Sequence, residues 1–341
     1  VMIVEHRVED VLTIHPERVI YMDEGLITYA GGRDGLLQAV DYSRIKLPAE
    51  IVMDRARSDP LPQFEPILKQ DPLNLDELVR FDQVHFRYDD ELPFVLDDIN
   101  FSIHTGDVIA ILGHNGSGKT TMVKHALGLL KPTTGHVYLE GKSTQSITVA
   151  TAAKSVGYVF QSPTQMLFAP TVAEELAFGP INLGMVKADI ENNIQWAIET
   201  VNLEEELDSP PLALSFGQQK RISIAAVLSM HSRILMMDEP TAGQDYWNYR
   251  TFMDAILQMP GFDAIAFITH DLDLALIYAN RILILYGGRI VADGPPEAVL
   301  ADEERLIQCH ILPTSLLSLN KLHLPVTGSF YRAETLAHMI G

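Results

Sequence analysis

The sequence predicts an α/β fold, and three features of the chain indicate it. The apolar run Val108–Leu112 has the length of a buried strand and leads into a glycine-rich loop and then a helix from Thr121. A second apolar strand, Ile234–Met237, ends in two acidic residues. From Val84 to Ile103 apolar and polar residues alternate in short runs, which is typical of antiparallel strands at the edge of a sheet.

Length and composition limit the classes of protein to which the chain can belong. Its 341 residues suffice for one large domain with additional segments, and 47% hydrophobic with 21% charged residues indicate a globular chain. No apolar run approaches the roughly 18 residues that a membrane-spanning helix needs, so a membrane role would work through a partner. The formal charge of −20 disfavours broad contact with nucleic acid. The single cysteine, Cys309, suits a reducing compartment.

The loop after the first strand matches a phosphate-binding pattern. Residues Gly113–Thr120 fit G-x-x-x-x-G-K-[ST], in which the glycines let backbone N–H groups turn towards a phosphate. The helix that follows adds its positive end. Lys119 can reach the β- and γ-phosphates, and the Thr120 hydroxyl can ligate Mg²⁺. The residues of this loop expected to bind ATP are Gly113, His114, Asn115, Gly116, Ser117, Gly118, Lys119, Thr120 and Thr121.

The acidic pair Asp238–Glu239 supplies the other half of the expected metal site. An acid at the end of a second buried strand is suited to hold Mg²⁺ through its water shell, and we expect Asp238 to do so. Its neighbour Glu239 is then placed to orient or deprotonate an attacking water.

The first forty residues resemble a later segment of the same chain. Val1–Leu12 and Ala266–Ile277 both read as an apolar strand, a histidine and an amphipathic helix. Pro16–Gly31 and Ala279–Gly294 both read as an arginine, two short strands around a glycine turn and a final glycine. His6 thereby corresponds to His270, and Arg18 to Arg281. We interpret the first segment as the end of a preceding copy of the same domain.

Five prolines between Leu47 and Pro72 indicate a linker. Proline fixes φ and removes a hydrogen-bond donor, so this segment is predicted to be extended, interrupted at most by a short turn. The prolines are Pro48, Pro60, Pro62, Pro66 and Pro72. The complete domain is expected to begin near Leu75.

The segment Leu214–Arg221, LSFGQQKR, distinguishes this chain from other proteins with a phosphate-binding loop. Together with Gln161, Asp238–Glu239 and His270, it resembles the ATP-binding cassette family over about Leu75–Leu300, with the motifs in the family's order. The resemblance implies a mixed, mainly parallel core sheet flanked by helices, an antiparallel β subdomain and a helical subdomain. It also implies ATP hydrolysis between two cassettes that pair head to tail.

The resemblance assigns roles to individual residues. Tyr88 would stack on adenine, Gln161 would sense Mg²⁺ and contact a membrane partner, and His270 would bond the γ-phosphate. Asp245 would close the loop that crosses the interface. The residues that would meet the nucleotide of the opposite cassette are Ser215, Phe216, Gly217 and Gln218.

Two places depart from the family's pattern. Phe216 stands where glycine is usual, and a phenylalanine adopts positive φ less readily than glycine does. The interface loop reads Ala242-Gly243-Gln244-Asp245 instead of the commoner run of small residues. The phenylalanine at position 216 puts the turnover rate of its site in question, but not the expectation of nucleotide binding.

The stretch Gln161–Gly184 resembles the ATPases of energy-coupling-factor importers, which take vitamins or metal ions into prokaryotic cells. Such an ATPase would lie at the cytoplasmic face of the membrane. Its partners would be a second cassette, fused or from a second copy, a transmembrane coupling subunit and a substrate-binding membrane subunit. The fused form resembles ATPases assigned to hydroxymethylpyrimidine or thiamine uptake, but an ATPase does not contact the transported compound.

These interpretations divide the chain into four parts. Residues 1–46 are expected to be the remnant of a first cassette, 47–74 a proline-rich linker, 75–300 a complete cassette and 301–341 a small C-terminal extension. The aliphatic content of Leu312–Gly341 favours a folded extension, which we expect to pack on its own cassette or on a partner.

Two alternative functions stay open from the residues alone. A soluble cassette ATPase of translation would need basic surfaces, and one of DNA maintenance would need a long heptad insertion, for which Lys124–Leu214 is too short. A regulatory cassette that binds ATP without hydrolysis agrees with Phe216 but not with the intact Glu239 and His270.

Overall fold

The computed structural model describes residues 8–13, 15–23, 25–42, 44–58, 75–242 and 246–340. The chain forms two compact units. The larger unit comprises Pro66–Ala242 and Ile256–Leu312, and the smaller unit comprises Val1–Glu65, Gly243–Ala255 and Pro313–Gly341.

A six-stranded sheet forms the centre of the larger unit. Its strand order is β12-β11-β5-β10-β9-β8. The strands are β5 (Val108–Leu112), β8 (Val156–Val159), β9 (Ile234–Asp238), β10 (Ala264–Ile268), β11 (Arg281–Tyr286) and β12 (Arg289–Gly294). All neighbouring strands are parallel except β12, which is antiparallel to β11. The carboxyl ends of β5, β8, β9 and β10 therefore meet at one edge, where α/β proteins place their ligands.

A second, antiparallel sheet has the order β4-β3-β6-β7. It consists of β3 (Glu77–Phe86), β4 (Leu96–His104), β6 (Thr134–Leu139) and β7 (Lys142–Ser143). Its inward side chains share one apolar core with the six-stranded sheet, in which Phe81, Ile99, Ile111 and Ala266 are all buried. The alternation seen from Val84 to Ile103 thus belongs to the antiparallel sheet, as expected.

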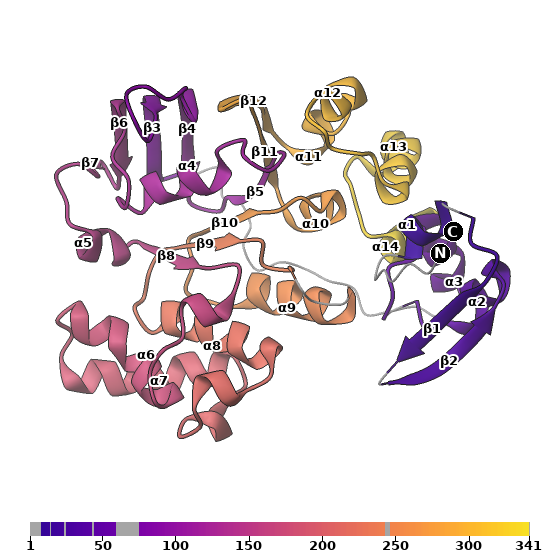
Figure 1. The fold of residues 1–341 in the computed structure, drawn as a ribbon, viewed down its shortest axis with the longest axis horizontal. Helices are drawn as coiled ribbons and strands as arrows, with labels where there is room; N and C mark the ends of the chain where they lie inside the picture. Colours follow the sequence, from indigo (N-terminus) through magenta and orange to yellow (C-terminus); the bar gives the residue numbers. More distant parts are fainter. Residues whose placement is uncertain are drawn as a thin grey trace. The chain divides into compact units, whose positions relative to one another are not determined.

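Helices cover the sheets and form a separate layer at one end of the larger unit. They are α4 (Lys119–Ala126), α5 (Val149–Ala153), α6 (Val172–Asn182), α7 (Lys187–Thr200), α8 (Phe216–Leu228), α9 (Tyr246–Gln258, which begins in the smaller unit), α10 (Leu272–Tyr278), α11 (Pro296–Val299) and α12 (Glu303–Gln308). Helices α6, α7 and α8 pack on one another, at the opposite end from β3, β4 and β6 (Figure 1). The predicted α/β fold, with its antiparallel and helical subdomains, is confirmed.

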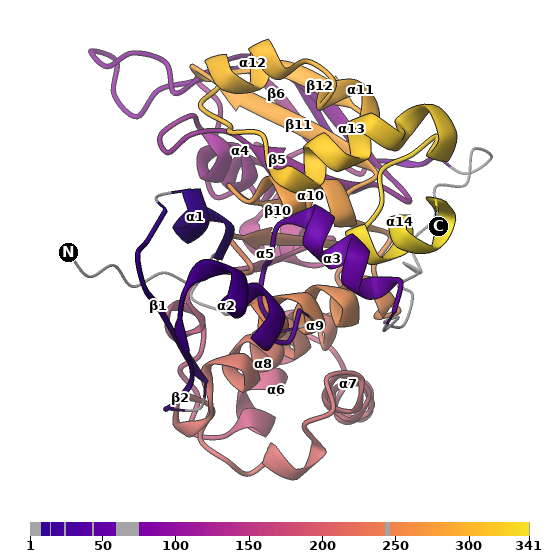
Figure 2. The same cartoon turned by 90° about the vertical axis from the view of Figure 1, so that its right-hand side faces the viewer.

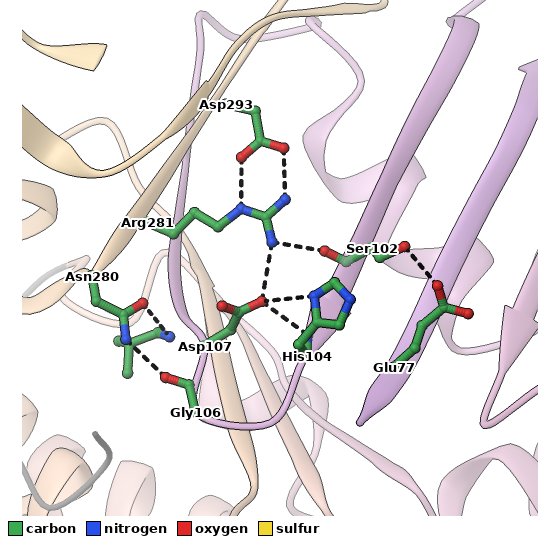
Figure 3. Close-up of polar contacts among 9 residues, drawn as sticks. Glu77, Ser102, His104, Gly106, Asp107, Asn280, Arg281 and Asp293 are labelled. Atoms are coloured by element: carbon green, nitrogen blue, oxygen red, sulfur yellow. Dashed lines mark hydrogen bonds and ion pairs between the residues drawn. The ribbon is translucent and has the colours of Figure 1, made fainter. Parts of the chain in front are cut away.

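Arg281 joins the start of β11 to both sheets (Figure 3). Its guanidinium donates two 2.6 Å hydrogen bonds to Asp293 and others to Asp107 and to the Ser102 carbonyl. The Asp107 side chain is only 3% exposed. A buried carboxylate without its partner is costly, so this bidentate cation fixes the hairpin β11–β12 against β4 and β5.

The smaller unit combines segments from both ends of the chain. It contains α1 (Val8–Thr13), β1 (Val19–Asp23), β2 (Leu26–Gly31), α2 (Arg33–Ala39), α3 (Ala49–Ala56), α13 (Ser315–Thr327) and α14 (Ala333–Ile340). Helix α3 packs on α13 and α14, and Ser315 Oγ accepts a 2.9 Å hydrogen bond from the Ala49 backbone. The C-terminal extension is thus folded from Ser315 onward, and it packs on α3, which lies within the segment predicted to be the linker.

The prediction of an extended linker is wrong at its beginning, because α3 occupies Ala49–Ala56. Pro48 is the N-cap of this helix, a position at which the missing backbone N–H of proline costs no helical hydrogen bond. Residues 59–74 lie outside the described part of the chain.

The hairpin β1–β2 has the same pairing register as the hairpin β11–β12. Five residue pairs join each hairpin, from Val19–Gly31 in one and Ile282–Gly294 in the other, and both have a register shift after the third pair. Figure 2 shows β1 and β2 beside α2, which follows them as α11 follows β12. Their surroundings differ, because Ile20 is 53% exposed whereas Leu283, its counterpart, is fully buried.

Among the described residues, no helix combines the length and the apolar character needed to cross a membrane.

Candidate nucleotide site

The glycine-rich loop lies between the fully buried strand β5 and helix α4. Gly113, Gly116 and Gly118 all have positive φ, at 147°, 84° and 104°. A Cβ atom at Gly113 would lie 2.3 Å from the carbonyl oxygen of Leu285, so a side chain does not fit there. The loop therefore takes the tight curl that the sequence predicts, with backbone close to its neighbours.

Lys119 spans this loop. Its ammonium donates hydrogen bonds to the carbonyl oxygens of Gly113, at 2.7 Å, and His114, at 3.0 Å. Burial lowers the pKa of Lys119, while the carboxylates of Glu239 and Asp238 oppose that shift. A cation held by the carbonyl oxygens of a curled backbone is suited to receive the charge of a phosphate chain.

Thr120 and Asp238 meet directly. The Thr120 hydroxyl donates a 2.8 Å hydrogen bond to Oδ2 of Asp238, although the two residues come from α4 and β9. Hydroxyl and carboxylate oxygens are the ligands that Mg²⁺ prefers, so this donor set fits the metal that the sequence predicts.

Tyr158 is a site residue that sequence reasoning missed. Its hydroxyl donates a 2.9 Å hydrogen bond to the same oxygen of Asp238. Burial and the Asp238 charge raise the pKa of the Tyr158 hydroxyl, so it stays a donor at neutral pH. In the sequence this tyrosine lies within the apolar strand VGYV, where it reads as a packing residue.

Glu239 and His270 also come together. The Nδ1 atom of His270 lies 3.0 Å from Oε2 of Glu239, and the side chains are 63% and 13% exposed respectively. Glu239 has a φ of +46°, an unusual conformation for a residue with a side chain. Backbone strain of this kind persists where surrounding structure enforces it, and here the Glu239 N–H is bonded to the Ile268 carbonyl.

Gln161 and Tyr88 lie at the borders of this site. Gln161 follows β8, whose neighbour β9 carries Asp238, and its exposed side chain makes no hydrogen bond with the described residues. Tyr88 is 58% exposed, and its hydroxyl lies 3.2 Å from Oγ1 of Thr121. An exposed ring held beside the phosphate loop is compatible with the expected stacking on a base.

The signature residues form the beginning of α8. Ser215 is the N-cap, and a reciprocal capping box joins it to Gln218. Phe216 is the first helical residue and does not have positive φ, and Gly217 has open space around its Cα. The expected conformational penalty at Phe216 is therefore wrong, because a helical position accepts phenylalanine. Asp245 and His6 lie outside the described residues.

Comparisons with known proteins identify the family of the chain. The family model described as ABC transporter matches residues 96–242. The energy-coupling factor transporter ATP-binding protein EcfA of Methanocaldococcus jannaschii is 38% identical over 69% of this chain and 85% of its own length. The chain thus belongs to the ABC transporter ATPase family, whose members hydrolyse ATP.

Two further relatives cover more of the chain. An ABC transporter ATP-binding protein of Enterococcus faecalis is 34% identical over 94% of this chain, which spans 61% of that relative's length. The solved structure of CbiO1 from Clostridium perfringens, part of the ABC transporter complex CbiONQ, matches with a TM-score of 0.62 and 29% identity. That match covers 78% of this chain and 99% of CbiO1.

Proposed function

We propose that this chain is the ATP-binding and ATP-hydrolysing part of an importer of the energy-coupling-factor type. It would energise uptake of a vitamin or metal ion through separate membrane subunits. The observation that carries the proposal is the convergence of Lys119, Asp238, Glu239 and His270 at one edge of the sheet in a chain similar to EcfA over most of that protein's length.

The geometry supports a division of labour within the site. Thr120 and Asp238 would hold Mg²⁺, with Gln161 at its border, and the metal would neutralise phosphate charge. Lys119 and the backbone N–H groups of the loop would bind the phosphates. Glu239 would accept a proton from, or orient, the attacking water, and His270 would hold the Glu239 carboxylate and bond the γ-phosphate.

A second cassette would complete the site. Ser215, Phe216 and Gly217 of the signature are exposed at the beginning of α8, where a helix N-terminus favours an anion. The hairpin β1–β2 supports a first cassette fused before this one as that partner, in preference to a second copy of this chain. Its register is that of β11–β12, but among the described residues β1 pairs only with β2, whereas β11 also pairs with β5.

An apolar surface near Gln161 supports a membrane partner. Phe168 and Phe178 are 61% and 50% exposed, and their rings contact edge to face at 4.7 Å. Buried Glu175 accepts hydrogen bonds from the backbone N–H groups of Phe168 and Ala169, so the exposed segment is held in place. An exposed aromatic pair on a fixed segment suits protein docking. We propose that the chain lies at the cytoplasmic face of a prokaryotic membrane, as its similarity to the energy-coupling-factor ATPase EcfA implies.

Steady-state ATP hydrolysis as a function of protein concentration tests the enzymatic part of the proposal. The rate per molecule should rise with concentration when two cassettes pair, and it should vanish in Glu239→Gln, which should retain ATP in tight pairs. A wild-type chain that binds MgATP and never hydrolyses it, even when combined with a first cassette, would favour a regulatory cassette instead.

Fractionation of cells that produce the protein tests the transport part. The wild-type protein should sediment with membranes, and Phe168→Asp should release it without loss of nucleotide binding. Thr164→Asp, a change at a residue of the same segment outside the aromatic pair, is the matched control. Sedimentation with ribosomes or chromosomal DNA would favour the translation or DNA-maintenance alternatives, which the charge of −20 disfavours.

A further inference from the structure

Lys220 is a buried cation within the signature helix α8. Only 1% of the residue is exposed, and it is among the largest side chains that are fully buried in the described chain. An ammonium group in such surroundings is costly unless it has hydrogen-bond partners and a nearby opposite charge. The partners of Lys220 therefore indicate why the helix carries a lysine at this position.

The first partner belongs to the turn after strand β9. The Lys220 ammonium donates a hydrogen bond to the carbonyl oxygen of Pro240, the residue that follows Glu239. The Glu239 carboxylate also acts on Lys220 through its charge, which favours the protonated form of the lysine. Lys220 is thus attached to the short turn that presents Glu239 in its positive-φ conformation.

The second partner is the residue that departs from the family's signature. The Lys220 Nζ atom lies 5.3 Å from the centre of the Phe216 ring, one helical turn away on α8. A cation at this distance from an aromatic face is attracted to it. Phe216 is 40% exposed, so its ring lies between the buried ammonium and the surface that carries Ser215 and Gly217.

We propose that Lys220 is a positioning residue that couples the signature end of α8 to Glu239 through Phe216 and Pro240. The inference rests on the proposed function, in which the signature meets the nucleotide of the opposite cassette and Glu239 acts on this cassette's own nucleotide. One buried side chain then joins the two ATP sites of a pair. Occupation of the signature fixes Phe216, and with it the ammonium that holds the turn behind Glu239.

Three variants separate the parts of this connection. Lys220→Met keeps the length and helix propensity of the side chain but removes its charge and its donor. Lys220→Arg keeps both charge and donors. Phe216→Leu removes the aromatic face at an exposed position and leaves Lys220 in place. Amide hydrogen exchange of the segment 239–242, the MgATP dissociation constant and kcat are measured for each, together with the melting temperature.

We expect Lys220→Met to accelerate exchange at 239–242 and to lower kcat by about 100-fold, the usual consequence of a small displacement of a reacting group. The MgATP dissociation constant should stay within about threefold of wild type, because the phosphate loop is not involved. Lys220→Arg should restore much of kcat and the slow exchange. Phe216→Leu should give an intermediate kcat and weaken the dependence of the rate on a second bound ATP.

Specific outcomes would overturn the proposal. Unchanged exchange at 239–242 in folded Lys220→Met shows that the lysine does not hold the turn. A merely structural role of Lys220 follows if Lys220→Met loses ATP binding, melting temperature and exchange protection throughout the chain to the same degree. In that case Lys220→Arg also fails to restore them. If Lys220→Met does not fold, wild-type behaviour of Phe216→Leu in both kcat and nucleotide dependence overturns the coupling. Absence of hydrolysis in the wild type contradicts the proposed function, whereas exchange at 239–242 still decides whether Lys220 holds the turn.

Discussion

Nδ1 of His270 lies 3.0 Å from Oε2 of Glu239, across the carboxyl ends of the parallel strands β10 and β9. The two side chains come from separate segments of sequence, and their pairing follows from the adjacency of the strands. A carboxylate at 13% exposure that is held through one oxygen by an imidazole has a fixed direction.

Replacement of His270 by alanine should therefore impair chemistry more than binding. We expect kcat to fall by about 100-fold, the contribution typical of a positioned acid–base group, with a smaller change in the MgATP dissociation constant. His136→Ala, at an exposed histidine of β6, is the control and should behave as wild type. Equal kinetics of the two variants would contradict the role of His270.

The hydrogen bond from Tyr158 to Asp238 leads to a prediction about Mg²⁺ affinity. Removal of its hydroxyl in Tyr158→Phe leaves Asp238 with one donor fewer, and a hydrogen bond to a charged group contributes about 1.5–3 kcal/mol. The Mg²⁺ concentration that gives half-maximal ATP hydrolysis should change by about tenfold, whereas nucleotide binding in EDTA should not change. Tyr138→Phe, in the antiparallel sheet, is the matched control. A common Mg²⁺ dependence of both variants and wild type would exclude a role of Tyr158 at the metal.

The parts of the site that lie in local motifs could be predicted from the sequence. The phosphate loop needs glycines at fixed positions between a strand and a helix, and Asp238 follows the apolar run Ile234–Met237, whose length favours a buried strand. The Thr120–Asp238 hydrogen bond confirms that these two motifs meet. The functional roles of the individual residues stay predictions.

Features that depend on tertiary contacts could not be predicted. Tyr158 gains its role from a neighbouring strand, and no local pattern distinguishes it from a packing residue. Pro48 suggested an extended chain, yet a proline at a helix N-cap is compatible with the helix that follows and that α13 and α14 cover. From the sequence, Phe216 suggested a strained backbone because it stands where glycine is usual. Only the structure shows that it occupies the first helical position of α8, which accepts a phenylalanine.

The buried lysine gives a pH-dependent prediction. Burial lowers the pKa of Lys220 from 10.5 to about 8, and Glu239 opposes the shift. Between these values the unfolded chain binds the proton and the folded chain does not, so stability should rise with pH in this window. The free energy of unfolding of wild type minus that of Lys220→Met should increase by up to about 3 kcal/mol from pH 7.5 to pH 10.5. Other titrating groups cancel in this difference, which denaturant titrations at several pH values measure.

Activity should change in the opposite direction over the same range. The charged form of Lys220, which Phe216 and Glu239 stabilise, is present below about pH 8 and is lost above it. We therefore expect kcat to decline as the pH rises through this value. Lys220→Arg should remove the decline, since guanidinium keeps its proton. A decline that persists unchanged in Lys220→Arg would assign it to another group.

The hairpins β1–β2 and β11–β12 allow a comparison between equivalent positions in different surroundings. Ile20 and Leu283 occupy the same place in β1 and β11, but Ile20 is 53% exposed and Leu283 is fully buried between β5 and β12. If β1 belongs to the core sheet of a first cassette, as we propose, its second neighbour there is a parallel strand that leads into another phosphate loop, as β5 is for β11. Ile20→Asp should then be harmless in this chain alone, within about 0.5 kcal/mol, whereas Leu283→Asp should unfold the larger unit.

The same Ile20→Asp change should be severe in a two-cassette protein that carries this chain as its second part. There the aspartate would lie in the core sheet of the first cassette, and burial of an unpaired carboxylate prevents stable folding. Melting curves recorded with ATP bound to each cassette distinguish the two cassettes. In the Ile20→Asp variant only the first cassette should lose its melting transition. Equal stability of that first cassette with isoleucine or aspartate at position 20 would show that β1 is not part of its sheet, and the hairpin would then be an addition to the second cassette alone.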